Sequence, residues 1–339
     1  MTQINRRWLL ARRPQGKATV DDFAYDEQPF TPPDLADGQV LVRTRVFSCA
    51  PTMRNWMNEP GRSYRASIGL GDPIIGIAAG EVLASRHPRF PVGCSISAVM
   101  RWEDYTVLTP DTSPTPVLRV AEGVTPVDAL GIFGLNSLTA YFGMLRVGEP
   151  KPGETVVVSG AAGSTGSVAV QVARNIGCRV IGIAGGAAKC ARLVEELGLD
   201  GAIDYKSENV SARLKELCPD GVNVFYDNVG GEILQAVMEN VAVHARIAVC
   251  GQVAAYDSDQ PAPGPRDMMK LVYWRVRIQG FVMGDYAHDS DAALAQLRQW
   301  RDEGRLTYRT DLRDGFDKLP GAFLDLFTGG NDGALLVRS

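Results

Sequence analysis

The fold is decided by residues 154–184, which read ETVVVSGAAGSTGSVAVQVARNIGCRVIGIA. The apolar, β-branched run at 155–158 predicts a buried strand. From Ser164 onward, apolar residues recur at helical spacing, and Gly177 provides a stop signal. A second β-branched run at 179–184 completes a strand–helix–strand unit of about 30 residues. These residues therefore predict one unit of a parallel sheet.

Between this strand and helix lie Gly160, Gly163 and Gly166, three residues apart. Glycines allow the backbone to approach a pyrophosphate closely, and the first N–H groups of the helix supply donors and a partial positive charge. The match to G-x-G-x-x-G is imperfect because Ala161 stands where the first glycine is expected, and glycines also end strands for structural reasons. The position between a buried strand and a helix nevertheless favours a dinucleotide site.

The end of the second strand indicates which dinucleotide binds. An NAD enzyme usually carries Asp or Glu about 20 residues beyond the glycines, where the carboxylate binds the ribose 2′-hydroxyl. Here residues 185–189 read GGAAK, and no acid appears before Glu195. An acid would repel a 2′-phosphate whereas Lys189 would attract it, so the sequence favours NADP over NAD. The alternative is that Lys189 is simply a solvated helix residue.

The composition is that of an ordinary globular protein. The 339 residues are 45% hydrophobic and 22% charged, and the formal net charge of -4 gives no general basic field for nucleic acid. The arginine-rich N-terminus has an apolar core of only three residues, and no later run approaches a membrane span. We therefore expect a cytoplasmic protein with neither nucleic-acid nor membrane partners. None of the six cysteines forms C-x-x-C, which disfavours a zinc loop or a disulfide framework.

The remaining sequence is of two kinds. Residues 1–120 are rich in Pro and Gly and carry short β-like runs, which predict a mostly antiparallel, partly barrel-like domain. After a helical stretch at 125–145 and the unit described above, strands and helices continue to alternate. This pattern predicts a doubly wound parallel sheet whose ligand lies at the carboxyl ends of the strands. The expected strands lie at 40–47, 74–83, 95–100, 201–204, 222–226, 245–250 and 275–282, and the expected helices at 189–197 and 210–217 and from Glu232.

The last part of the chain contains a Pro-rich loop at 260–265, which we expect to act as a lid because a long loop above a sheet edge is usually functional. A helix at 291–303 and a strand at 333–337 are expected to return to the first domain.

Taken together, the motifs resemble the medium-chain dehydrogenase/reductase superfamily over nearly the whole chain. Within it, they resemble the zinc-independent branch of leukotriene B4 12-hydroxydehydrogenase, prostaglandin reductases, alkenal double-bond reductases and curcumin reductase. The resemblance rests on NRRWLLARRPQG from Asn5, SCAPTMRNWM from Ser48, LTAYFG from Leu138, ETVVVSGAAGSTGS from Glu154, IDYKSE from Ile203, FYDNVGGE from Phe225, AVCGQVAAY from Ala248 and GFVMGDY from Gly280.

Such a relative implies a Rossmann domain at 124–288 that binds NADP(H), and a mostly β, GroES-like catalytic domain at 1–123 and 289–339. It also implies a homodimer joined near 275–282 by the last strands of two Rossmann sheets. Catalytic zinc in the superfamily needs Cys, His and Glu or Cys ligands. Residues 76–82, where a His-Glu pair would stand, contain no histidine, and His87, His244 and His288 lie far apart. We therefore expect no metal.

The activity implied is NADPH-dependent reduction of the carbon–carbon double bond of α,β-unsaturated ketones and aldehydes. A hydride goes to the β-carbon, and the protein must stabilise the enolate oxygen. A tyrosine hydroxyl suits this task because it can donate a hydrogen bond while it stays neutral at pH 7, since its reference pKa is about 10. Tyr256 is the first candidate, since it follows a strand end over the cofactor, and Tyr64 matches a second pocket tyrosine. Each could instead be a packed aromatic residue.

The resemblance also implies a set of cofactor contacts. Gly163 and Ser164 would touch the pyrophosphate, and Lys189 and Tyr205 the 2′-phosphate end. Asn228 would hold the cofactor near a strand end, or could instead cap the helix that begins near Glu232. The other cofactor contacts expected are Thr165, Gly166, Gly185, Cys250, Gly251, Phe281, Val282 and Asn331.

Two other functions remain open from the sequence. One is a quinone oxidoreductase of the same superfamily, which would use the same cofactor pocket. The other is a non-catalytic NADPH-binding sensor.

Overall fold

The computed structural model describes residues 3–61, 63, 65–258, 260 and 263–339. The contacts between Cα atoms divide the chain into two units, Met1–Gly134 with Thr310–Ser339 and Leu135–Arg309. Each unit has its own sheet and its own apolar core.

The unit Leu135–Arg309 is built on a six-stranded parallel sheet in the order β10-β9-β8-β11-β12-β13. The chain runs outward from β8 to β10, returns to β11 beside β8, and then runs outward in the other direction. The strand order therefore reverses between β8 and β11, which is where a doubly wound sheet opens a crevice at its carboxyl edge. The predicted doubly wound fold is confirmed. The strands are β8 Thr155–Ser159, β9 Arg179–Ala184, β10 Gly201–Asp204, β11 Val222–Asp227, β12 Val241–Val249 and β13 Arg277–Gly280.

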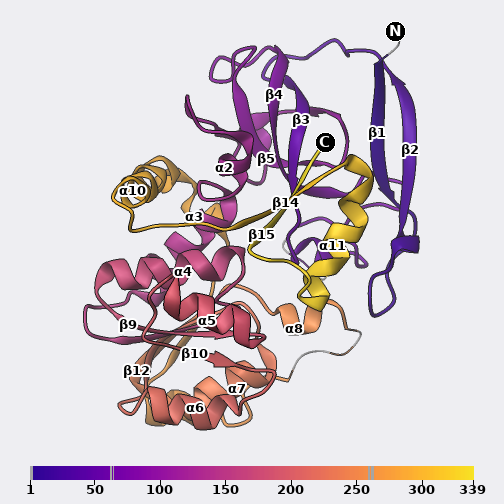
Figure 1. Cartoon of the computed structure of the whole chain (residues 1–339). Coiled ribbons are helices and arrows are strands. Elements are labelled where there is room, and N and C mark those ends of the chain that lie inside the picture. Colours follow the sequence, from indigo (N-terminus) through magenta and orange to yellow (C-terminus); the bar gives the residue numbers. More distant parts are fainter. Residues whose placement is uncertain (1–2, 62, 64, 259, 261–262) are drawn as a thin grey trace. The chain divides into compact units, whose positions relative to one another are not determined.

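Helices cover both faces of this sheet (Figure 1). Val156, Val157 and Val158 of β8 are all fully buried, as a continuous apolar strand requires when both of its faces are covered. Helix α4 buries Val168 and Val172, which share one face at helical spacing. The helices are α3 Leu135–Phe142, η3 Gly143–Gly148, α4 Ser164–Ile176, α5 Ala187–Glu195, α6 Val210–Leu217, α7 Gly231–Glu239, α8 Val253–Tyr256, α9 Lys270–Tyr273, η4 Met283–Asp289 and α10 Ser290–Asp302.

The other unit contains a mostly antiparallel seven-stranded sheet in the order β14-β15-β3-β4-β5-β7, with β6 also paired to β3. Its mostly β character was predicted and is confirmed. The C-terminal strand β15 pairs with β3, so both ends of the chain build this sheet. The strands of the unit are β1 Gln3–Leu10, β2 Phe23–Phe30, β3 Val40–Ser48, β4 Ile75–Ser85, β5 Ser95–Arg101, β6 Tyr105–Leu108, β7 Leu118–Arg119, β14 Thr310–Asp314 and β15 Ala334–Arg338.

Strands β1 and β2 of this unit form a separate two-stranded antiparallel sheet. The core of the unit gathers large aromatic side chains, among them the fully buried Trp102 and Phe47. The helices are η1 Val20–Asp22, α1 Met53–Trp56, η2 Pro110–Thr112, α2 Pro126–Leu130, η5 Phe316–Lys318 and α11 Leu319–Thr328. None of the described helices of either unit is long and apolar enough to cross a membrane.

The prediction of one helical stretch at 125–145 is wrong in detail. The chain forms α2, breaks at Gly131, which has φ −87° and ψ −111°, and resumes as α3. A Cβ on Gly134 would lie 2.4 Å from the carbonyl oxygen of Leu130, so the break depends on a close backbone approach. Helix α3 then passes into the π-helix η3, whose Gly143 lies under the ring of Phe281.

The boundaries between the two units lie after residues 134 and 309, later in the sequence than the boundaries expected after residues 123 and 288. Helix α2 contacts β3 and β4, so it groups with the antiparallel sheet. Helix α10 contacts α3, with the rings of Tyr141 and Trp300 6.0 Å apart, so it groups with the parallel sheet and not with the first domain. The predicted lid at 260–265 lies partly outside the described residues.

Candidate active site

The glycine turn after β8 forms the base of the site. Gly163 is the N-cap of α4, so the main-chain N–H groups that follow it have no partner within the helix. Gly160 has φ +58°, a conformation that favours glycine. A Cβ on Gly166 would lie 2.2 Å from the carbonyl oxygen of Gly160 and 2.8 Å from Ala161 Cα, so this position accepts only glycine without a backbone shift. The turn therefore presents a bare backbone and a helix N-terminus, as an anion requires.

The hydroxyl of Ser164 is engaged by the protein. Its Oγ accepts a hydrogen bond from Asn136 Nδ2 at 2.8 Å and lies 2.5 Å from the hydroxyl oxygen of Tyr308. Burial raises the pKa of Tyr308 to about 12, so this phenol is neutral at ordinary pH. With its hydroxyl engaged, Ser164 offers a ligand its main-chain N–H at the start of α4, and the contact of Thr165 with a cofactor stays a prediction. No local motif indicates Asn136 or Tyr308, because they lie 28 and 144 positions from Ser164 in the sequence.

A buried aspartate organises the point where the strand order reverses. Asp227 ends β11, and its Oδ1 accepts hydrogen bonds from Ser159 Oγ at 2.8 Å and from the N–H groups of Val229 and Gly230 at 2.9 Å each. Burial raises the pKa of Asp227, while these donors act in the opposite direction. The carboxylate thus fixes the loop after β11 against the end of β8.

Asn228 strengthens the same junction. Its side-chain Nδ2 donates to the carbonyl oxygen of Ser159 at 2.7 Å, and its main-chain N–H donates to Ser159 Oγ at 2.8 Å. It does not cap α7, whose N-cap is Gly230. Asn228 therefore lies at the carboxyl edge of β8 and β11, beside the glycine turn, and its contact with a cofactor stays a prediction.

Tyr256 lies beside the end of β12. Its hydroxyl oxygen accepts a hydrogen bond from the N–H of Gln252 at 3.1 Å and lies 2.9 Å from the position that a Cβ on Gly251 would occupy. The N–H groups of Cys250 and Gly251 both donate to the carbonyl oxygen of Asp227. The tyrosine hydroxyl is thus held beside the end of β12, which is hydrogen-bonded to Asp227 at the point where the strand order reverses.

Cys250 directly follows β12, and its contact with a cofactor stays a prediction. Burial raises its pKa to about 11, so it stays protonated at neutral pH and is no nucleophile. Its neighbour Tyr226 is also buried, and the Tyr226 hydroxyl donates to the carbonyl oxygen of Thr139 at 3.1 Å.

Tyr205 and Lys189, the two residues expected at the 2′-phosphate, lie near the ends of β10 and β9, together with the predicted cofactor contact Gly185. Gly185 follows β9, and the Cε1 and hydroxyl atoms of Tyr205 lie 2.9 Å from the position of a Cβ on it. Tyr205 is 47% exposed, which leaves its ring available to a ligand. Lys189 lies in the first turn of α5, where its N–H donates to the carbonyl oxygen of Gly186. The structure thus places the Tyr205 ring beside Gly185 after β9 and Lys189 at the start of α5, and their contacts with a 2′-phosphate stay predictions.

Four further predicted site residues lie elsewhere in the chain, and nothing in the structure tests their roles. The Phe281 ring packs against Tyr226, with ring centroids 6.2 Å apart, and Val282 follows it as the N-cap of η4. Asn331 belongs to the other unit, where its Nδ2 donates to the carbonyl oxygen of Gly333 at 2.8 Å. Tyr64 lies outside the described residues. Roles for all four in binding or catalysis stay predictions.

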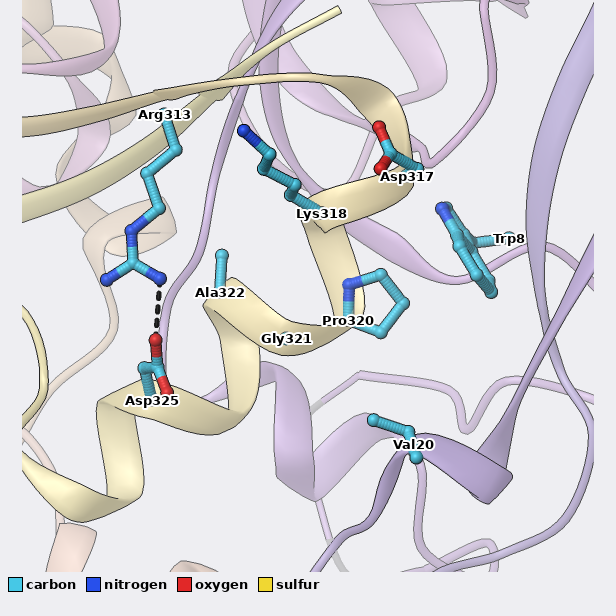
Figure 2. Close-up of a pocket in the computed structure, with 9 residues that line it drawn as sticks. All are labelled: Trp8, Val20, Arg313, Asp317, Lys318, Pro320, Gly321, Ala322 and Asp325. Carbon is cyan, nitrogen blue, oxygen red and sulfur yellow. Dashed lines mark hydrogen bonds and ion pairs between the residues drawn. The ribbon is translucent and has the colours of Figure 1, made fainter.

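A pocket of about 430 Å³ lies beside α11 in the antiparallel unit, and none of the predicted site residues lines it (Figure 2). Its wall includes an ion pair between Arg313 and Asp325 at 2.6 Å. Its lining residues are Trp8, Val20, Arg313, Asp317, Lys318, Pro320, Gly321, Ala322 and Asp325. Among the described residues, no group of three or more His, Cys, Asp or Glu side chains is placed to hold a metal ion.

Comparison with known proteins places this site in a family. Residues 6–115 match a family model described as the N-terminal domain of oxidoreductase, and residues 164–299 match one described as zinc-binding dehydrogenase. An NADPH-dependent curcumin reductase of Escherichia coli (strain K12) is 35% identical, over 99% of this chain and 97% of that protein. A 2-alkenal reductase (NADP(+)-dependent) of Nicotiana tabacum is 36% identical, over 88% of this chain and 86% of that protein.

The solved structures agree with these relatives. The crystal structure of CurA in complex with NADPH from Vibrio vulnificus superposes with a TM-score of 0.87 at 35% identity, over 98% of this chain and 99% of that chain. The identity and coverage of these relatives, together with the reversed parallel sheet and its glycine turn, show that the chain belongs to the zinc-independent branch of the medium-chain dehydrogenase/reductase superfamily.

Proposed function

We propose that this chain is an NADPH-dependent reductase of the carbon–carbon double bond of α,β-unsaturated ketones and aldehydes. The observation that carries the proposal is the Tyr256 hydroxyl, which accepts the Gln252 N–H beside the strand end of a dinucleotide-type sheet. The names of the curcumin and 2-alkenal reductases, which denote NADPH- or NADP-dependent reductases, support it.

The residues present fit NADPH. A Cβ on Gly166 would clash with the carbonyl oxygen of Gly160, and Gly160 has φ +58°, so the turn leaves its backbone bare. The first N–H groups of α4 have no partner within the helix, which suits a pyrophosphate. At the ends of β9 and β10, Lys189 and Tyr205 supply a cation and a hydroxyl for the 2′-phosphate. Asn228 would lie between these two positions and the substrate end.

When bound, NADPH supplies a hydride to the β-carbon of the substrate. The protein's task is then to stabilise the negative charge that develops on the substrate carbonyl oxygen. The Tyr256 hydroxyl can donate a hydrogen bond to that oxygen, and the N–H of Gln252 that it accepts polarises it and strengthens its donation. A proton from water at the α-carbon completes the saturated product.

The direct test measures NADPH oxidation with an enal, an enone and a quinone of similar size, alongside NADPH binding without substrate. We expect turnover with the enal and the enone and saturation of the double bond in the product. Turnover of the quinone alone would assign the chain to the quinone oxidoreductases. Tight NADPH binding with no turnover of any of the three would indicate a sensor instead.

Removing the Lys189 charge is expected to raise the KM for NADPH roughly tenfold and to leave the KM for NADH unchanged, because only NADPH carries the 2′-phosphate. Steady-state kinetics of Lys189→Ala with both cofactors measures this. Lys215→Ala, which removes an exposed lysine from α6, is the matched control and should change neither value. An equal rise for both cofactors would show that Lys189 acts on the fold and not on the phosphate.

We also propose that the chain forms a homodimer through β13. This strand is the last of the parallel sheet and, within the described chain, no further strand pairs with it. Helix α9 precedes it and exposes apolar side chains, with Val272 61% and Tyr273 58% accessible. An open strand edge beside exposed apolar groups is typical of a surface that pairs with another chain.

Sedimentation should therefore give the mass of a dimer for the wild type and a shift toward monomer for Val272→Asp, because burial of a new carboxylate is costly. Val20→Asp is the control, since Val20 is equally exposed but lies in the other unit. A monomeric wild type would contradict the proposal.

A further inference from the structure

Asp204 joins two loops that carry the expected contacts to the 2′-phosphate. It is the last residue of β10, and its Oδ1 accepts hydrogen bonds from the main-chain N–H groups of Gly186 at 2.7 Å and Lys206 at 3.0 Å. Its Oδ2 accepts a hydrogen bond from Ser207 Oγ at 2.9 Å. Both carboxylate oxygens are therefore occupied by donors of the protein itself.

The two loops depend on this carboxylate for their spacing. Gly186 has φ +100° and is the N-cap of α5, the helix that carries Lys189. On the other side, Lys206 follows Tyr205, whose ring lies against Gly185. Asp204 thus bonds the turn that begins the lysine-bearing helix to the turn that carries the tyrosine.

The negative charge of Asp204 has to be reconciled with the binding of a 2′-phosphate. A carboxylate near a 2′-phosphate would by simple electrostatics oppose its binding. The N–H groups of Gly186 and Lys206 lower the pKa of Asp204, so it is ionised at neutral pH. Because its oxygens are directed at these donors, however, the acid is bound to the protein and not offered to a ribose hydroxyl, unlike the acid at the strand end of an NAD enzyme.

We propose that Asp204 is a positioning residue that sets the preference for a phosphorylated dinucleotide, by holding the Gly186 turn against the turn of Tyr205 and Lys206. The role rests on the NADPH preference proposed above and adds to it a residue that touches neither phosphate nor ribose. Its effect passes through the spacing of Lys189 and Tyr205.

Binding of two fragments tests this role without any turnover. Calorimetry would compare adenosine 2′,5′-bisphosphate with adenosine 5′-monophosphate, which differ only in the 2′-phosphate. For Asp204→Ala we expect the affinity for the bisphosphate to fall roughly tenfold and that for the monophosphate to stay within about twofold. Asp204→Asn keeps an acceptor for Gly186 and Lys206, so it should retain the affinity for the bisphosphate within about twofold.

Each other outcome overturns the proposal in a different way. Tighter binding of the bisphosphate by both variants would show that Asp204 acts only by repulsion. Equal losses for the two fragments would show a purely structural role. If Asp204→Ala does not fold, Ser207→Ala, which removes the donor to Oδ2, should still weaken bisphosphate binding about twofold or more and spare the monophosphate. No selective loss there would overturn the proposal.

The same binding measurements distinguish failure of the NADPH proposal from failure of the Asp204 proposal. A wild type that binds the two fragments equally would overturn the preference for NADPH, and the role of Asp204 with it. A wild type that discriminates between them while Asp204→Ala discriminates equally well would overturn only the role of Asp204.

Discussion

Replacing Tyr256 with phenylalanine is expected to lower kcat for an enone by about 10²-fold or more, which is the usual cost of removing one donor to a developing oxyanion. The ring stays and only the hydroxyl is lost, so the affinity for NADPH should change little. The kcat value follows from NADPH oxidation at saturating substrate, and the Kd of NADPH from a direct binding titration.

The matched control is Tyr25→Phe. Tyr25 is 45% exposed and its hydroxyl donates to Glu27 Oε1 at 2.6 Å, so this variant also removes a hydroxyl and a hydrogen bond, but in β2 of the other unit. Its kcat should equal that of the wild type. An unchanged kcat for Tyr256→Phe would remove the tyrosine from the mechanism, whereas a loss of NADPH affinity equal to the loss of kcat would make it a cofactor contact.

Gly166→Ala is expected to abolish measurable NADPH binding and to lower the melting temperature. The new Cβ would lie 2.2 Å from the carbonyl oxygen of Gly160, and the atom in the way is backbone, which cannot rotate aside. Overpacking of this kind typically costs about 1–3 kcal/mol or more, and here the strain falls on the turn that must receive a pyrophosphate. Thermal unfolding and an NADPH titration measure the two effects.

Gly321→Ala provides the comparison. Gly321 lies inside α11, and a Cβ there meets nothing within 4 Å. Alanine should leave NADPH binding unchanged and stabilise the protein by up to about 1 kcal/mol, because it is the better helix former. If Gly166→Ala bound NADPH as tightly as the wild type does, the glycine turn would not be the phosphate site.

Local sequence patterns were sufficient to predict several elements of the parallel unit. The apolar spacing and the stop at Gly177 predicted α4, a β-branched run predicted β9, and the alternation of strands and helices predicted β10, with the bounds that the structure shows. The same reasoning failed at 125–145, because the break at Gly131 goes with the close backbone approach of Gly134 to the carbonyl oxygen of Leu130, which periodicity does not contain.

Sequence motifs predicted only part of the candidate site. The glycine turn and the absence of an acid at 185–189 indicated a phosphorylated dinucleotide. The hydrogen bonds that shape the site join residues far apart in sequence, 18 positions for Gly186 and Asp204 and 144 for Ser164 and Tyr308. No local pattern marks such pairs, because they form only once the register of the strands is set.

The pairing of β15 with β3 has a consequence for synthesis of the chain. The antiparallel sheet pairs β3 with β15, which come before and after the unit Leu135–Arg309 in the sequence, so this pairing can form only once β15 has left the ribosome. The unit Leu135–Arg309 is continuous in sequence and can form its core earlier. A chain truncated before β15 should therefore leave residues 46–48 of β3 without this partner strand, while the unit Leu135–Arg309 keeps all the strands of its own sheet.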